Sequence, residues 1–155
     1  MKPHLFIAPP REAIERALES WRWLPIRGRE PVLVTAFGDI FFEGKDGIWF
    51  LDTLEGTIQR ACNTRTELDE LLATIEGEDR YCLAGFVERA RREGMILKDG
   101  ETYDFTLHPV VGGKIEYENI QPRDFVVAVH IAGQLHEQVS HYPPGTEITR
   151  FVLKE

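Results

Sequence analysis

The sequence lacks the long apolar run that a membrane-spanning helix requires. Such a helix needs about 20 consecutive, mostly apolar residues, and no stretch of the 155 residues approaches this length. The opening "MKPHLFIAPP" has one lysine and an apolar run too short for a signal peptide. These absences predict a cytoplasmic protein that does not act at a membrane.

Cysteine is equally scarce. Cys62 and Cys82 are the only two, too few for a secreted disulfide scaffold and too far apart for a CxxC motif. They are expected to be reduced thiols, with Cys82 packed in an apolar part of a helix.

Positive charge is in deficit. Lysine and arginine number 18 against 26 acidic residues, a net charge of −8. Nucleic-acid affinity comes largely from neutralising phosphates, so this balance disfavours direct binding to nucleic acid. It permits a basic protein partner.

What is present fits one ordinary globular domain. Hydrophobic residues make up 43% of the chain and charged residues 28%, the profile of a folded protein. A chain of this length buries most of its apolar surface in one core, so residues 1–155 are expected to form a single domain.

A β-meander is predicted over "VLVTAFGDIFFEGKDGIWFLDTLEGTIQRAC", residues 32–62. Short β-rich runs alternate here with turn signals, and Asp46-Gly47 is a strong hairpin signal. Three or four antiparallel strands follow. Alternation in "IWFLDTL" places large apolar groups on both sides of the strand, so this strand is expected to be central, with Trp49 or Phe50 buried.

Helical periodicity appears before and after the meander. Residues 11–21 repeat apolar positions at helical spacing. Thr64 and Glu67 fit a capping box, with Asn63 as a rival cap. One apolar stripe is then predicted to be buried: Leu68, Leu71, Leu72 and Ile75. A further helix is expected over residues 80–93, followed by a hairpin around residues 99–100.

The stretch "HIAGQLHEQVSH", residues 130–141, raises the question of a metal. His136 and His141 are five residues apart, about 140° from each other on a helix, and His130 and His141 are about 16 Å apart along its axis. They cannot share one ion, and a metal would need ligands from elsewhere, such as His108. No metal and no other cofactor are predicted.

The same stretch is predicted to be helical, although "DFVVAVHI" also has strand character. On a helix two stripes oppose each other. The buried one is expected to hold Val127, Ile131, Leu135 and Val139, and the polar one His130, Gln134, Glu137 and His141.

Motifs for enzymatic chemistry are missing. No GxSxG element surrounds a serine, and "PVVGGK" lacks the first glycine and the hydroxyl residue of a phosphate-binding loop. The sequence therefore predicts no catalytic residue and a protein that is not an enzyme. The expected architecture is α+β, a mainly antiparallel sheet flanked by three to four helices.

Several segments together resemble a bacterial family of immunity proteins paired with type VI secreted DNase toxins. They include "FLDTLEG", "PVVGG", "ENI", "IAGQLHEQV" and "PPGT", in the order the family has them. The likeness covers roughly residues 15–150. Larger members carry a GAD-like domain on the N-terminal side, which is expected to be absent or minimal here.

The resemblance implies a cytoplasmic protein that binds and neutralises a cognate toxin, a basic DNase. The alternative is a small ligand-binding or regulatory module. Acidic residues are the expected contact surface, because opposite charge speeds association. The helical candidates are Glu67, Asp69, Glu70, Glu76, Glu78 and Asp79, and the hairpin candidates are Glu43, Asp46 and Glu55.

Overall fold

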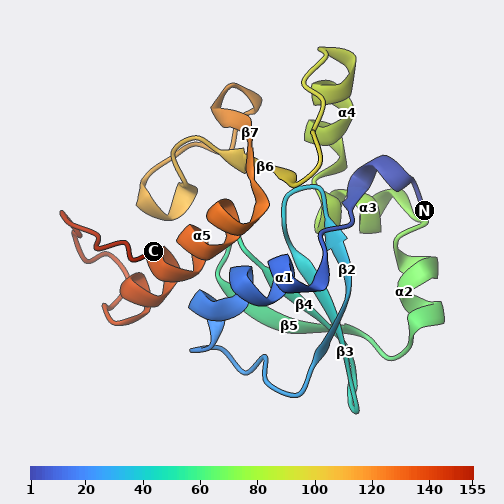
Figure 1. Ribbon diagram of the computed structural model, residues 1–155, viewed down its shortest axis with the longest axis horizontal. Helices are drawn as coiled ribbons and strands as arrows, with labels where there is room; N and C mark the ends of the chain where they lie inside the picture. Colours follow the sequence, from blue (N-terminus) through green and yellow to red (C-terminus); the bar gives the residue numbers. More distant parts are fainter.

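The predicted meander is the centre of the fold. The computed structural model describes residues 1–155, and its main sheet is antiparallel in the order β1-β2-β3-β4-β5 (Figure 1). The strands are β1 (Phe6–Ile7), β2 (Glu30–Thr35), β3 (Ile40–Gly44), β4 (Gly47–Asp52) and β5 (Thr57–Cys62). The hairpin prediction at Asp46-Gly47 is confirmed, because Gly44 pairs with Gly47.

Both faces of this sheet are buried. Ile48 and Phe50 of β4 pack in one hydrophobic cluster, whereas Leu51 packs in a second cluster on the other face. β4 lies between β3 and β5. The predictions that this strand is central and that Phe50 is buried are therefore confirmed.

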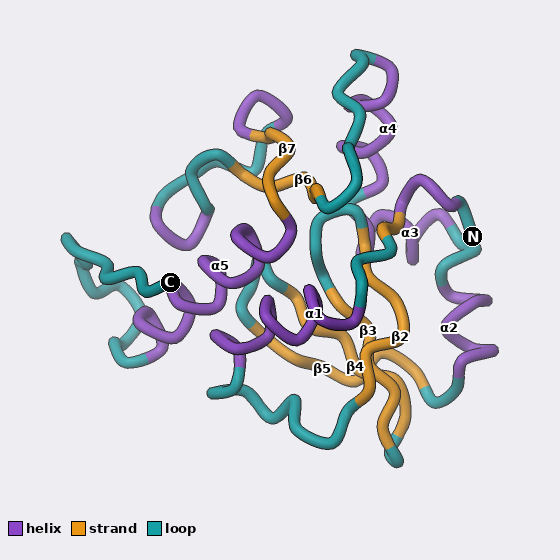
Figure 2. Tube along the Cα trace, viewed as in Figure 1, coloured by secondary structure: helices purple, strands orange, loops and turns teal.

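Helices cover the two faces as separate groups. They are α1 (Arg11–Leu18), α2 (Arg65–Leu71), α3 (Ile75–Cys82), α4 (Ala84–Arg92) and α5 (Phe125–Ser140). Helices α1 and α5 lie together on one face, and α2, α3 and α4 lie towards the other (Figures 1 and 2). The α+β prediction is confirmed, with five helices instead of three to four. None of them combines the length and apolar character that crossing a membrane demands.

The extra helix comes from a break in the stripe predicted over residues 68–75. Helix α2 ends at Leu71, and α3 begins with Thr74 as its N-cap, whose side chain accepts a hydrogen bond from the N–H of Gly77. Leu68 and Leu72 are buried as expected, but Ile75 is 74% exposed, so its predicted burial is wrong. A Cβ atom at Gly77 would lie 1.9 Å from the carbonyl oxygen of Leu71, and only glycine allows this sharp turn.

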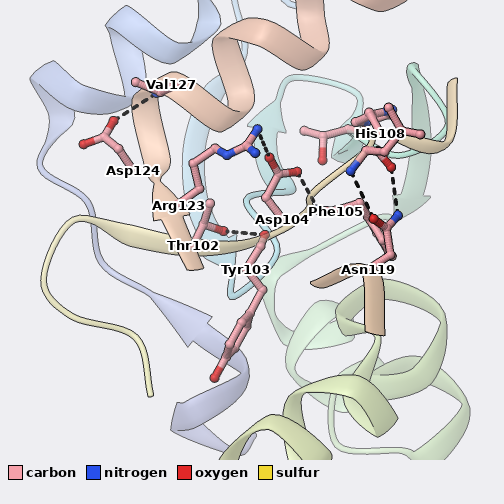
Figure 3. A network of polar contacts seen from close by, with 11 residues as sticks. Thr102, Tyr103, Asp104, Phe105, His108, Asn119, Arg123, Asp124 and Val127 are labelled. Carbon is pink, nitrogen blue, oxygen red and sulfur yellow. Dashed lines mark hydrogen bonds and ion pairs between the residues drawn. The ribbon is translucent and has the colours of Figure 1, made fainter. Parts of the chain in front are cut away.

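The hairpin predicted around residues 99–100 does not form. Strand β6 (Glu101–Phe105) pairs instead with β7 (Ile120–Asp124), far along the chain. The backbone N–H of Phe125 donates to the carbonyl of Gly100, so the turn before β6 lies against the start of α5. Figure 3 shows Arg123 of β7 reaching the carboxylate of Asp104 on β6, with 3.0 Å between the closest atoms.

Helix α5 forms where it was predicted, but of the stripe predicted to be buried, Val127, Ile131, Leu135 and Val139, only Leu135 is buried. Phe125, Ala128, Val129 and Ala132 are among its buried residues, whereas Val127 is 47% exposed. Asp124 caps the helix by accepting from the N–H of Val127 (Figure 3). Alanine and glycine on the buried side allow close approach of the neighbouring segment, and this outweighs the regular spacing of the predicted apolar stripe.

The tightest contact of α5 is with the 3-10 helix Glu19–Trp21. A Cβ atom at Gly133 would lie 2.2 Å from the hydroxyl oxygen of Ser20 and 2.8 Å from its carbonyl oxygen. The indole N–H of Trp21 donates to the carbonyl of Val129 over 2.8 Å. Gly133 therefore sets how closely the two segments pack.

Two glutamines on α5 bind the backbone of the C-terminal segment. The amide of Gln138 accepts from the N–H of Val152 and donates to its carbonyl, over 2.9 and 2.7 Å. The amide of Gln134 does the same with Lys154, over 2.5 and 2.7 Å. Gln134, predicted to lie on a polar stripe, is thus buried and hydrogen-bonded.

Candidate partner-binding surface

Helices α2 and α3 present carboxylates to solvent. Asp69 and Glu70 on α2 and Glu76 and Asp79 on α3 are exposed. None of the four lies in an ion pair. Ile75 lies on the same helical face as Glu76 and Asp79 and is 74% exposed. These five residues are called the acidic α2–α3 surface below.

Glu78 does not face solvent as expected. It is buried, with 6% of its surface exposed, and its carboxylate lies 3.3 Å from the ammonium of Lys2. His4 makes a second side-chain contact at this point, a hydrogen bond between its Nε2 and the carboxylate of Glu88 on α4. Leu5 is fully buried beside them. Glu78 therefore anchors the N-terminal segment to α3, because a buried carboxylate requires a charged partner.

Glu67 is occupied by helix capping. Its backbone N–H donates to the hydroxyl of Thr64, and its carboxylate accepts from the backbone N–H of Asn63 over 2.7 Å. The capping box is confirmed with one change, since the glutamate binds the residue before the cap. Hydrogen bonds from Asn63 hold the pKa of Glu67 below its usual value.

The three hairpin candidates, Glu43, Asp46 and Glu55, do not lie together in the structure. Asp46 is paired with Arg29 over 2.9 Å, and this contact lowers its pKa. Its backbone carbonyl accepts from Arg60, which also contacts Asn63 at the start of α2. Glu43 is exposed on β3 near this end, whereas Glu55 follows β4 at its opposite end. The nine predicted residues therefore do not form one continuous field.

A buried polar centre surrounds Thr53, the residue after β4, and sequence reasoning missed it. The carbonyl of Thr53 accepts from Nε2 of His136 over 2.9 Å and from Nε2 of His108 over 3.2 Å. The Thr53 N–H and hydroxyl donate to the carboxylate of Asp39, over 2.8 and 2.7 Å. The only sequence signal was an isolated aspartate inside the apolar run "TAFGDIFF".

Burial shifts the titration of this centre. Loss of solvation raises the pKa of Asp39 to about 7, with the nearby charge of Asp52 as the second cause. It lowers the pKa of His108 to about 4, with His136 adding repulsion. The pKa of His136 is also lowered, again mainly by burial. The histidines are thereby held neutral.

The polar groups of this centre bind one another and leave no space for a ligand. Nδ1 of His108 accepts from the N–H of Val110, so both ring nitrogens of this histidine are engaged. A Cβ atom at Gly56 would lie 2.3 Å from Nδ1 of His136, which leaves no room for a ligand on that side. The cavity beside Asp39 and His108 has a volume of about 10 Å³, and no three potential metal ligands come together.

One comparison with known protein families agrees with the resemblance noted in the sequence. Residues 65–136 match the family model described as "T6SS immunity protein Tdi1, C-terminal". No curated protein matches the sequence. A solved structure that matches is the crystal structure of Atu4351 from Agrobacterium tumefaciens, with 20% identity and a TM-score of 0.48. That match covers 85% of this chain and 68% of the other.

The matched range begins at the first residue of α2 and ends within α5. It contains the acidic α2–α3 surface, the β6–β7 ribbon and both histidines of the buried centre. Residues 65–136 are thus similar to the C-terminal region of a type VI secretion immunity protein, and this similarity supports an immunity role.

Proposed function

We propose that this chain is a cytoplasmic immunity protein that binds and neutralises a cognate nuclease toxin through the acidic α2–α3 surface. The family match over residues 65–136 carries the immunity role. A nuclease must present a basic surface to phosphate, and acidic residues speed encounter with such a surface. The protein acts by covering the toxin and performs no catalysis itself.

The placement of the carboxylates supports this surface over the other acidic residues. Glu70 lies in the last turn of α2, where the negative end of the helix dipole disfavours a carboxylate. Helix stability therefore does not explain it. Ile75 adds an exposed aliphatic group among the charges, and a central apolar residue with a charged rim is typical of protein interfaces.

The test is a binding measurement against the cognate toxin. The variant Glu70→Lys/Glu76→Lys should slow association about tenfold at low salt, with a smaller effect above about 0.3 M salt, because salt screens exposed charges. Glu12→Lys/Glu19→Lys is the matched control, since Glu12 on α1 and Glu19 in the 3-10 helix that follows it are both exposed outside any ion pair. It changes the net charge by the same amount.

Three further readouts complete the test. Ile75→Ser should speed dissociation without changing the association rate, because contact residues act mainly on dissociation. The purified toxin should cut DNA, and this protein should inhibit the cutting. If the double reversal stays folded, associates at the unchanged rate at low salt and still protects cells, the interface lies elsewhere.

A further inference from the structure

A second surface of the molecule has the opposite character to the acidic α2–α3 surface. A groove of about 640 Å³ lies between α1 and the segment 26–31 that leads into β2. One wall is a single face of α1, made of Arg11, Ile14, Glu15 and Leu18 at helical spacing. Ile26 contributes an aliphatic side chain from the other wall.

The groove is positively charged in an acidic protein. Four arginines and two glutamates line it, a net charge of +2, while the whole chain carries −8. Arg11 is neutralised by Glu15 and Glu30, and this pair raises its pKa further. Ion pairing therefore accounts for Arg11.

Of the three remaining arginines of the groove, one is paired and two are not. Arg29 binds Asp46, and its guanidinium lies 3.9 Å above the ring of Trp49. Arg22 and Arg27 are exposed, and neither lies in an ion pair. Two free guanidinium groups therefore stand beside an aliphatic floor.

We propose that this groove binds an acidic segment of a partner protein that carries aliphatic side chains. Each free guanidinium offers a planar pair of N–H donors that fits a carboxylate. Ile14, Leu18 and Ile26, all lining residues, offer an apolar floor on which an aliphatic side chain of the segment rests. The groove runs along two turns of α1, which suits an extended peptide.

Charge complementarity selects this occupant over a nucleic acid. Arginine also binds phosphate, but a nucleic acid brings a continuous row of phosphates. Because Glu15 and Glu30 engage Arg11 and Asp46 engages Arg29, only Arg22 and Arg27 are free, which is too few for such a row. A segment that alternates carboxylates with aliphatic groups places its charges at Arg22 and Arg27 and its apolar groups between them.

The probe is a fluorescein-labelled peptide, Asp-Leu-Glu-Glu-Leu-Asp, titrated with the full chain and followed by fluorescence anisotropy. We expect saturable binding, weakened about tenfold by Arg22→Glu/Arg27→Glu. Arg16→Glu/Arg65→Glu is the control, since these arginines are exposed outside the groove and form no ion pair. It should change binding less than about twofold.

Two further peptides separate the contribution of the leucine side chains from that of the carboxylates. A peptide with serine in place of both leucines should lose most of the binding, and one with asparagine and glutamine in place of the acids should lose it too. Amide NMR shifts on titration should centre on residues 18–28.

The proposal fails if the peptide does not saturate, or if the control variant weakens binding as much as the groove variant. It also fails if a six-nucleotide single-stranded DNA binds more tightly than the peptide at the same salt concentration. Melting curves of both variants show that each is folded. The groove variant changes no residue of α2 or α3, so its outcome is independent of the acidic α2–α3 surface.

Discussion

The ring of His108 meets the ring of His136 edge to face, with 5.2 Å between their centroids, and both donate to one carbonyl. Protonating His108 would remove the acceptor that its Nδ1 offers to Val110. It would also place a charge beside a second histidine. This pair therefore makes the fold sensitive to acid.

We expect the contribution of His108 to the stability of the fold to fall between pH 6.5 and pH 4. The pKa of His108 is about 4 in the folded state and 6.5 in the unfolded chain, so the unfolded state binds more protons in this window. Stability is full above pH 6.5 and is lost as the pH falls. His108→Gln, which keeps a donor for Thr53, should flatten this dependence in thermal melts, and His141→Gln should not. An equal slope in all three proteins would contradict the assignment.

Asp39 should act in the opposite direction. Its pKa is about 7 in the folded state against 3.8 in the unfolded chain, so the folded state holds the extra proton. Stability from this group is full below pH 3.8 and is lost as the pH rises through 7. Asp39→Asn keeps an acceptor for Thr53 and should remove this loss, so the variant should gain stability relative to the native chain from pH 5 to pH 8. Urea unfolding at the two pH values measures it, and a constant difference would contradict the prediction.

Gly133 and Gly85 should respond oppositely to alanine. At Gly133 the new methyl group would meet the hydroxyl and carbonyl of Ser20, and such overpacking costs about 1–3 kcal/mol. At Gly85 of α4 no atom lies within 4 Å of the added group, so alanine should be neutral or stabilising by up to about 1 kcal/mol. Chemical denaturation compares the two.

A double variant separates the two contacts at Gly133. Ser20→Gly removes the hydroxyl but not the carbonyl, so Ser20→Gly/Gly133→Ala should recover part of the loss. Full recovery would mean that the carbonyl does not limit the approach of α5.

The two glutamines of α5 should control hydrogen exchange in the C-terminal segment. Gln134→Leu/Gln138→Leu removes the acceptors of the Val152 and Lys154 N–H groups. Because each hydrogen bond contributes about 1 kcal/mol, exchange of these two amides should speed up about fivefold or more. Gln59→Leu, exposed on β5, is the control. Unchanged exchange at both amides would show that the glutamines do not hold this segment.

The sequence predicted those parts of the fold that local signals determine. Asp46-Gly47 defined a hairpin whose strands have neighbours on both sides, and Thr64 with Glu67 defined the start of α2. The β6–β7 pairing could not be predicted in this way. Its partners are separated by the segment from Thr106 to Asn119, which is too long for a hairpin signal to mark them as neighbours.

Two errors arose from reading apolar spacing alone. Ile75 continued the spacing of Leu72, but Thr74 capped a new helix and turned Ile75 outward. On α5 the apolar spacing of residues 127, 131, 135 and 139 was regular, yet only Leu135 of them is buried. The buried face also includes Ala128 and Ala132, small residues that the pattern undervalues. The buried centre could not be predicted, because His108 and Asp39 meet only through the tertiary fold.

The hydrogen bonds between α5 and residues 152–154 determine which substitutions this segment tolerates. The glutamine amides bind N–H and carbonyl groups that every residue except proline offers. Val152, Leu153 and Lys154 can therefore be exchanged for other residues with the segment still attached. Proline is excluded at 152 and 154 but allowed at 153. This makes the segment a place to graft an epitope or a fluorescent amino acid.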